Sequence, residues 1–256
     1  MAQITWTGYR TIVRKEITRI LRIWTQTLVP PAITMTLYFV VFGGLIGSRV
    51  GEMGGFDYMQ FIVPGLVMMS VITNAYGNVS SSFFSAKFAR HVEELLISPL
   101  PNWVIVAGYV TAGSFRGLAV GVVVMIVASF FTEFHIAHWP VMLGVLFLTA
   151  ITFSVAGMIN GIFARKFDDV AIIPTFILTP LTYLGGVFYS INLLPEFWRN
   201  VSQVNPILHM VNALRYGMLG TSDLNIGIAF AIILGFLVVL LSLCLYLMNR
   251  GVGLRS

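Results

Sequence analysis

The sequence predicts an all-α polytopic membrane protein with six transmembrane helices. Three observations support this fold class: 57% of the residues are hydrophobic, only 10% are charged, and the mean hydropathy is +0.89. Soluble domains carry roughly 25% charged residues, and a soluble fold of 256 residues could not bury so much apolar surface. The net charge of +5 is spread too thinly to form a nucleic-acid-binding patch. We therefore expect the lipid bilayer, and no nucleic acid, as a partner.

Residues 4–25 are predicted to form an amphipathic helix at the surface of the membrane. Trp6, Ile17 and Trp24 belong to an apolar stripe with steps of three or four residues, while Arg14 and Arg19 occupy other faces. A basic amphipathic helix of this kind fits a layer of anionic headgroups. A plain flank of the first membrane span would show the same pattern, so both interpretations stay open.

Six nearly uncharged runs of about 18 or more residues are each long enough to cross a bilayer as a helix. They cover residues 28–46, 58–80, 103–131, 139–164, 170–194 and 224–249. Residues 195–218 are apolar but are interrupted by Asn205, Pro206 and Arg215, so we expect short external re-entrant helices there. The whole chain, residues 1–256, is thus predicted to be a single transmembrane domain.

The distribution of basic residues predicts the orientation of these spans. Eleven of the 15 Lys and Arg residues precede span one, follow the sixth span, or lie in the loops after spans two and four. Cytoplasmic loops carry an excess of Lys and Arg. We therefore expect both termini in the cytoplasm of a multi-pass inner-membrane protein.

The chain lacks the motifs that would make it an ATPase or an ordinary enzyme. No lysine is followed by Ser or Thr, so the phosphate-binding loop that ends in Gly-Lys-Ser/Thr is absent. The spans contain no Asp, Glu or His, which counts against an ion-coupled secondary transporter. Glu133, His135 and His138 resemble metal ligands but fit a polar turn better. We expect no catalytic, cofactor-binding or metal-binding residues; the secondary transporter and an intramembrane enzyme are the alternatives.

Arg116 is the one charge inside a predicted span. It lies thirteen residues after Trp103, near mid-bilayer, where a charge costs at least ~2.5 kcal/mol. It could bind carbonyl groups at a helix interface, contact an anionic group of a substrate, or lie less deep than this count suggests. Gly113 and Gly117 beside it offer a smooth face, either for packing inside the chain or for a subunit interface.

Two spans carry uncharged polar stripes at helical spacing. Span two has Ser70, Thr73 and Asn74, and span five has Thr175 and Thr179. Such stripes suit either hydrogen bonding between helices or the lining of a path. The loop after span two carries a short amphipathic helix, residues 86–97, that could lie on the membrane or dock into a groove on a partner.

Two groups of residues resemble ABC-2 type permeases, the membrane subunits of bacterial ABC transporters. The first is Glu94-Leu95-Leu96-Ile97-Ser98-Pro99 after span two. The second is a series in the expected order: Pro180, Gly185-Gly186-Val187-Phe188, Leu194-Pro195, Asn205-Pro206 and Arg215-Tyr216. The resemblance covers essentially the whole chain.

This resemblance implies a half-transporter that works with other polypeptides. A second permease copy, giving a homodimer, and two copies of a separate ABC ATPase would complete it. ATP and Mg would be bound by the ATPase, and substrate would move outward. Residues 86–97 would correspond to the coupling helix that contacts the ATPase. The implied ATPase-coupling residues are Lys87, Arg90, Glu93, Glu94, Leu95, Leu96, Ser98 and Pro99.

The resemblance also implies a path formed largely by spans one, two and five. The candidate path-lining residues are Thr34, Tyr38, Ser70, Thr73, Asn74, Asn78, Thr175, Thr179, Thr182 and Tyr183. Because none of them is charged, we expect a hydrophobic or amphipathic substrate, a drug or a lipid-like molecule. A lipid-linked polysaccharide is the alternative. It fits the uncharged path less well, because a phosphate-bearing lipid should favour more basic contacts along its route. Arg116 matches no motif of the family, so its role stays open.

Overall fold

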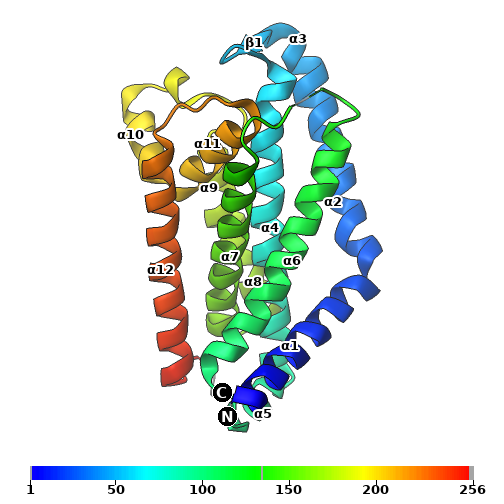
Figure 1. Ribbon diagram of the computed structural model, residues 1–256, viewed down its shortest axis with the longest axis vertical. Helices are drawn as coiled ribbons and strands as arrows, with labels where there is room; N and C mark the ends of the chain where they lie inside the picture. Colours follow the sequence, from blue (N-terminus) through cyan, green and yellow to red (C-terminus); the bar gives the residue numbers. More distant parts are fainter. Residues whose placement is uncertain (1, 134, 254–256) are drawn as a thin grey trace.

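The computed structural model describes residues 2–133 and 135–253, and it is built almost entirely of helices (Figure 1). The long helices run along the long axis of the molecule, and both ends of the chain lie at the same end of the bundle. The elements are α1 (Ala2–Arg22), α2 (Trp24–Tyr38), η1 (Phe39–Ile46), α3 (Gly47–Val50), β1 (Glu52–Met53), β2 (Phe56–Asp57), α4 (Tyr58–Phe88), α5 (His91–Ile97), α6 (Asn102–Ala128), α7 (Trp139–Phe163), α8 (Phe167–Ile173), η2 (Pro174–Leu178), α9 (Thr179–Tyr183), η3 (Ile191–Leu193), α10 (Glu196–Val204), α11 (Pro206–Leu219) and α12 (Ile226–Arg250).

Within the described residues, 5 helices are long and apolar enough to cross a membrane. They are residues 24–50, 58–88, 102–128, 139–163 and 226–250, at the positions of the predicted first, second, third, fourth and sixth spans.

The predicted fifth span, residues 170–194, differs from the structure. Its helix consists of α8, η2 and α9 and ends at Tyr183. Gly185 and Gly186 follow, and Gly186 has a φ of +70°, a left-handed conformation that stops a helix. The segment is therefore shorter than predicted, and a sixth crossing stays a prediction.

Helix α4 forms the centre of the bundle and packs mainly against α6 and α7. Glycines permit this close approach: a Cβ atom on Gly117 of α6 would lie 2.8 Å from the Cβ of Ala75 and 3.0 Å from the carbonyl oxygen of Val71. Gly157 of α7 faces the backbone of Tyr76 in the same way. The glycine repeats therefore serve packing inside one chain.

Helix α1 crosses the lower part of the bundle obliquely and packs on α6 (Figure 1). Its buried face consists of Ile12, Glu16 and Ile20, whereas Trp6 and Trp24 of the predicted apolar stripe are 64% and 56% exposed. The helix ends at Arg22, and the first long apolar helix begins at Trp24, earlier than the predicted residue 28. The face toward the bundle thus includes a carboxylate, and contact with a leaflet stays a prediction.

At the end of the bundle opposite the termini, α10 and α11 lie where short helices were predicted over residues 195–218 (Figure 1). Asn205 separates them, and its side chain accepts a hydrogen bond from the backbone N–H of Ile207 at 3.0 Å. Helix α11 packs on α4, α7 and α12. Its Arg215 is buried, lies 3.9 Å from the ring centroid of Phe61, and donates from Nη2 to the carbonyl of Gly186 at 2.7 Å. Two short helices therefore occupy this region, and their re-entry into a bilayer stays a prediction.

Candidate functional site

Helix α4 is buried over most of its length except for a stripe of small polar residues. Thr73 and Ser81 are exposed, and a Cβ atom on Gly77 would meet nothing within 4 Å. The hydroxyl of Thr73 donates to the carbonyl of Met69 at 2.7 Å, and that of Ser81 donates to the carbonyl of Gly77 at 2.6 Å. The stripe is therefore an open surface whose hydroxyl donors are already satisfied by the helix itself.

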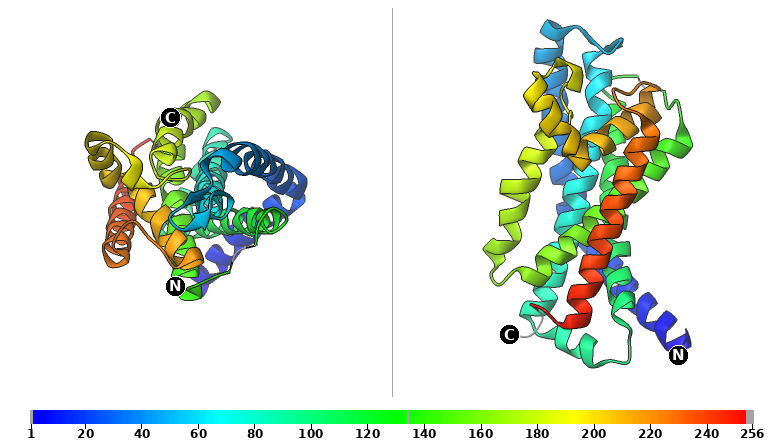
Figure 2. Two further views of the ribbon diagram at one scale, coloured as in Figure 1. Left: turned by 90° about the horizontal axis from the view of Figure 1, so that it is seen from above. Right: turned by 90° about the vertical axis from the view of Figure 1, so that its left-hand side faces the viewer.

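Two peripheral segments lie beside α4: α2–η1, and the joined segments α8, η2 and α9 (Figure 2). Helix α4 contacts η1 near its start and α8 near its end, where the Phe84 and Phe167 rings lie 5.0 Å apart. The two segments meet each other through Tyr38 and Tyr183, whose hydroxyl oxygens are 3.4 Å apart. The stripe thus lies between two contacts along α4.

The predicted path-lining residues fall into two groups. Exposed or half-buried are Thr34, Tyr38, Thr73, Asn74, Thr175, Thr179 and Tyr183. Buried are Ser70, Asn78 and Thr182. The hydroxyls of Ser70 and Thr182 donate to Leu66 and Leu178 in their own helices, at 2.9 and 2.7 Å. In this conformation, Ser70 and Thr182 therefore do not face an open surface.

The predicted coupling helix, residues 86–97, is divided in the structure. Helix α4 continues to Phe88, and Arg90 turns the chain with a φ of 61° before α5 begins at His91. Lys87 therefore belongs to α4, where its Nζ donates to the carbonyls of Ile162 and Ala164, both at 2.6 Å. Lys87 also donates to the carbonyl of Gly253 at 3.2 Å. It ties three parts of the chain together at this end of the bundle.

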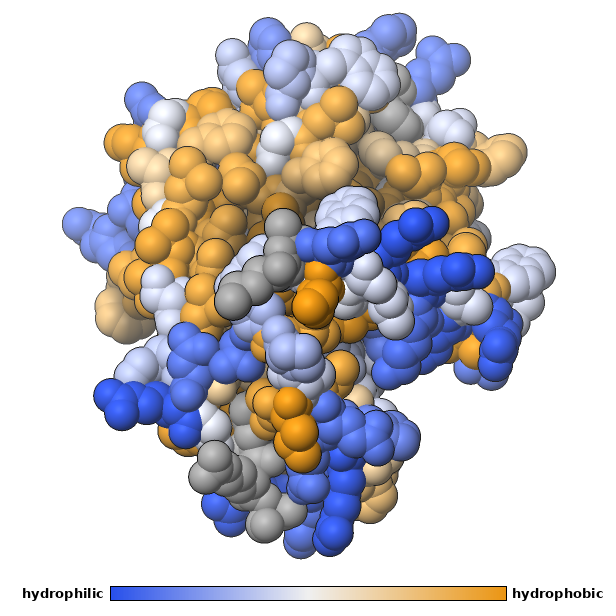
Figure 3. All heavy atoms as spheres, turned by 60° about the horizontal axis from the view of Figure 1, so that its bottom comes forward, coloured by the Kyte–Doolittle hydropathy of each residue, from blue (hydrophilic) through white to orange (hydrophobic). Residues whose placement is uncertain are grey.

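Helix α5 presents a mixed acidic and apolar surface at the end that carries the termini. Glu93 and Glu94 are exposed, Ile97 is 85% exposed, and Val92 is buried. Arg90 and Pro99 are also exposed, while Leu95, Leu96 and Ser98 are half-buried. Figure 3 shows many hydrophilic residues over this end, a broad hydrophobic area beyond it, and hydrophilic residues again at the far edge. This end therefore suits water and a partner, whereas the sides suit lipid.

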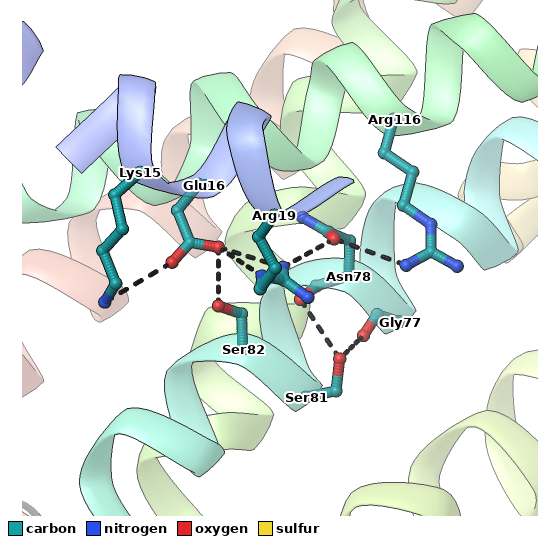
Figure 4. Close-up of polar contacts among 8 residues, drawn as sticks. All are labelled: Lys15, Glu16, Arg19, Gly77, Asn78, Ser81, Ser82 and Arg116. Carbon is teal, nitrogen blue, oxygen red and sulfur yellow. Dashed lines mark hydrogen bonds and ion pairs between the residues drawn. The ribbon is translucent and has the colours of Figure 1, made fainter. Parts of the chain in front are cut away.

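A polar cluster joins α1, α4 and α6 beside the Gly77 and Ser81 end of the stripe (Figure 4). Oε2 of Glu16 accepts hydrogen bonds from Arg19 Nε at 3.1 Å, Arg19 Nη2 at 2.9 Å and Ser82 Oγ at 2.6 Å. Oδ1 of Asn78 accepts from Arg19 Nη2 at 2.9 Å and from Arg116 Nη1 at 3.5 Å. Asn78 and Arg116 were candidates from the sequence, whereas the roles of Glu16, Arg19 and Ser82 were not predicted.

One signal in the sequence could have led to Glu16. It is the only acidic residue before Glu52, and it stands among Arg14, Lys15 and Arg19. A lone acid on the apolar side of a basic helix indicates a specific partner, because an unpaired buried carboxylate is costly.

Glu133, His135 and His138 lie in the turn between α6 and α7 or at its end. Within residues 2–133 and 135–253, no group of three His, Cys, Asp or Glu residues is placed to hold a metal ion. The ring of His138 stacks on Tyr216 at 4.6 Å between centroids, while Glu133 and His135 are exposed. These side chains therefore act as surface and packing residues in the structure.

Comparison with known proteins identifies the family. Residues 7–219 match the family model of the ABC-2 type transporter. The inner membrane transport permease YadH of Escherichia coli K12 is 56% identical over 256 residues, which cover 100% of both chains. Nodulation protein J of Sinorhizobium fredii is 28% identical over 188 residues, 72% of this chain and 70% of that protein. Nodulation protein J of Rhizobium meliloti is 26% identical over 197 residues, 75% and 74% of the two chains.

These matches confirm the resemblance to ABC-2 type permeases found in the sequence. They indicate the membrane subunit of a transporter rather than an enzyme. With its apolar helices, the chain belongs to the ABC-2 type transporter family as a multi-pass inner-membrane transport permease.

Proposed function

We propose that this chain is the membrane-spanning permease subunit of an ATP-driven exporter for a hydrophobic or amphipathic molecule, drug-like or lipid-like. The open polar stripe of Thr73, Gly77 and Ser81 carries the proposal. It lies on the most buried long helix, and burial would normally cover such a stripe with another helix. A second copy of the chain, placed against this face, would enclose a path lined by hydroxyl groups.

Membership of the ABC-2 family implies a partner ATPase. We assign two ATPase copies and a permease homodimer, with both termini in the cytoplasm and α8–α9 as a sixth crossing. The excess of Lys and Arg at the terminal end of the bundle supports this orientation.

Helix α5 is the proposed contact for the ATPase. Glu93, Glu94 and Ile97 offer a combination of charge and apolar surface that an amphipathic groove can bind. Lys87 lies behind this helix and bonds to the backbone of neighbouring segments. A push on α5 would therefore reach the end of α4 through a connected set of contacts.

The experiment purifies the tagged chain from native membranes in mild detergent, identifies co-purifying proteins and measures ATP hydrolysis. Glu94→Arg reverses a charge on α5, and Glu196→Arg reverses an exposed charge at the opposite end as a matched control. We expect an ATPase to accompany the wild type and the control but to be lost with Glu94→Arg. Purification of the chain alone, inert towards ATP, would refute the proposal and favour ion coupling.

A further inference from the structure

The polar cluster of α1, α4 and α6 carries more positive than negative charge. Oε2 of Glu16 accepts all three hydrogen bonds from Arg19 and Ser82, and Oε1 lies 3.8 Å from Lys15 Nζ. Among the described residues, Arg116 forms no ion pair; its contact is the amide oxygen of Asn78. Two guanidinium groups therefore share one amide oxygen, while one carboxylate neutralises only one of them.

The cluster lies well inside the bundle. Arg116 is 14 residues after Asn102, the start of α6, which corresponds to roughly 21 Å along the helix. Asn78 is 10 residues before Phe88, the end of α4, or roughly 15 Å. At such depths an uncompensated charge is unfavourable in a lipid environment. An anionic ligand would remove this cost.

The two arginines also reach the open face of the molecule. The side chain of Arg19 is 34% exposed, and Asn78 lies beside Gly77 and Ser81 of the polar stripe (Figure 4). Nε of Arg116 is buried with no hydrogen-bond partner. Arg116 as a whole residue is half-buried, so a ligand can approach the exposed part of its guanidinium group, whereas the unpaired Nε itself is enclosed.

We propose that Arg19 and Arg116 form a binding site for the phosphate-type anionic headgroup of an amphipathic molecule. The planar fork of a guanidinium matches phosphate oxygens with two parallel hydrogen bonds and is weakly hydrated, so its burial with an anion is favourable. The adjoining helix α2 exposes Val29, Ile33 and Leu37 at steps of four residues, a surface for the apolar chain of such a molecule. As a cargo site it rests on the proposed function and narrows the substrate to anionic amphiphiles.

This site changes the expectation of an uncharged path. The candidate residues on spans one, two and five are uncharged, but α1 and α6 place two arginines beside them. Selection of the substrate would then depend on its headgroup charge as well as on its apolar area.

The test measures binding of radiolabelled phosphatidylglycerol and, separately, phosphatidylcholine to the purified full chain in mixed micelles. Arg116→Gln removes the unpaired charge, Arg116→Lys keeps a charge without the fork, and Arg22→Gln removes an exposed arginine of α1 as a control. We expect phosphatidylglycerol to bind about tenfold more weakly to Arg116→Gln than to the wild type. The affinity should be partly restored in Arg116→Lys and unchanged in Arg22→Gln. An unchanged affinity in Arg116→Gln, or equal binding of both lipids to the wild type, would overturn the proposal.

A thiol-reactive dye checks folding, because the single cysteine of the chain, Cys244, is buried. If Arg116→Gln does not fold, competition in the wild type decides: dodecyl phosphate must displace phosphatidylglycerol, and dodecyl maltoside must not.

The bound headgroup could belong to a resident membrane lipid or to a cargo molecule. Repeating the binding measurement with the ATPase complex distinguishes these two sources. Phosphatidylglycerol retained throughout ATP hydrolysis indicates a resident membrane lipid, whereas ATP-dependent release indicates cargo; both outcomes support the site. Failure of the proposed function would appear as the absence of an ATPase during purification. That outcome would leave binding by the isolated chain intact, so the two failures are distinguishable.

Discussion

The central helices and the two peripheral segments of this molecule differ in burial and in helix type. In the most apolar 18-residue window of α4, 72% of the residues are buried, against 17% in Trp24–Val50. Both peripheral segments contain π-helix, at Phe39–Ile46 and at Pro174–Leu178, whereas α4, α6 and α7 are α-helical throughout. Helix α12 is buried to the same small extent, 17% of its window, yet it is α-helical throughout. Exposure alone therefore does not explain the π-helices.

The local sequence gives a physical reason for the difference. Pro174 lacks a backbone donor at the start of η2, and the hydroxyl of Thr179 donates to its carbonyl at 2.9 Å. In η1, Gly43 and Gly44 lower the cost of a departure from α-helical geometry. Because π-turns mark points where helices deform, we interpret α4, α6 and α7 as a rigid scaffold and the two peripheral segments with π-helix as deformable.

The largest expected effect is the loss of the scaffold in Gly157→Leu. The new side chain would collide with the backbone of Tyr76 in α4, which cannot move without separating two packed helices. We expect destabilisation at or above the upper end of the ~1–3 kcal/mol typical of overpacked cores. Size-exclusion chromatography in detergent should show aggregation.

Gly235→Leu is the matched control for Gly157→Leu. A Cβ atom on Gly235 of α12 would meet nothing within 4 Å. This variant should elute as the wild type does. Equal behaviour of the two variants would mean that α7 does not pack on α4 as closely as the structure shows.

The second effect is a difference in local opening between the π-helical segments and α4 in the unmodified chain. Hydrogen–deuterium exchange in lipid nanodiscs should be at least ~30-fold faster in residues 39–46 and 174–178 than in residues 62–72 of α4, a difference of about 2 kcal/mol in opening free energy. Exchange in α12 should resemble that of α4, because its hydrogen bonds are regular. Rapid exchange in α12 would show that exposure, and not π-helix, sets the contrast.

Much of the scaffold was predictable from the sequence. Long apolar runs located five helices because hydropathy and length depend on composition alone. The end of the fifth predicted span was missed because residues 184–194 are apolar and uncharged although they do not form a long helix. Only the positive φ of Gly186 distinguishes that turn, and hydropathy does not detect it.

The candidate site was less predictable than the helices. The stripe of Thr73 follows from helical spacing, which is local information. The contacts of Arg116 with Asn78, and of Glu16 with Ser82, join residues 38 and 66 positions apart in the chain. Such pairs depend on how α1 crosses the bundle, and one sequence without its fold does not determine that crossing.

The third effect is the release of α1 from the scaffold in Glu16→Gln. Glutamine keeps an acceptor for Ser82 but leaves Arg19 without a neutralising charge. We expect a loss of about 1–2 kcal/mol, below the value for a fully buried pair because Arg19 is partly exposed. A lower melting midpoint, measured through labelling of Cys244, would show it. Glu52→Gln, an exposed residue, should leave the midpoint unchanged.

The smallest effect belongs to Tyr183→Phe at the contact between the two peripheral segments. The 3.4 Å separation of the Tyr38 and Tyr183 hydroxyls is long for an O–H···O hydrogen bond, while the stacking of Tyr183 on Phe188, 5.8 Å between centroids, does not need the hydroxyl. We expect a change below ~0.5 kcal/mol in the opening of residues 174–183. Hydrogen exchange should thus be nearly unaltered in Tyr183→Phe, as in the control Tyr246→Phe on α12. A larger increase would mean that the contact between the Tyr38 and Tyr183 hydroxyls holds the two peripheral segments together, which would contradict the small effect expected here.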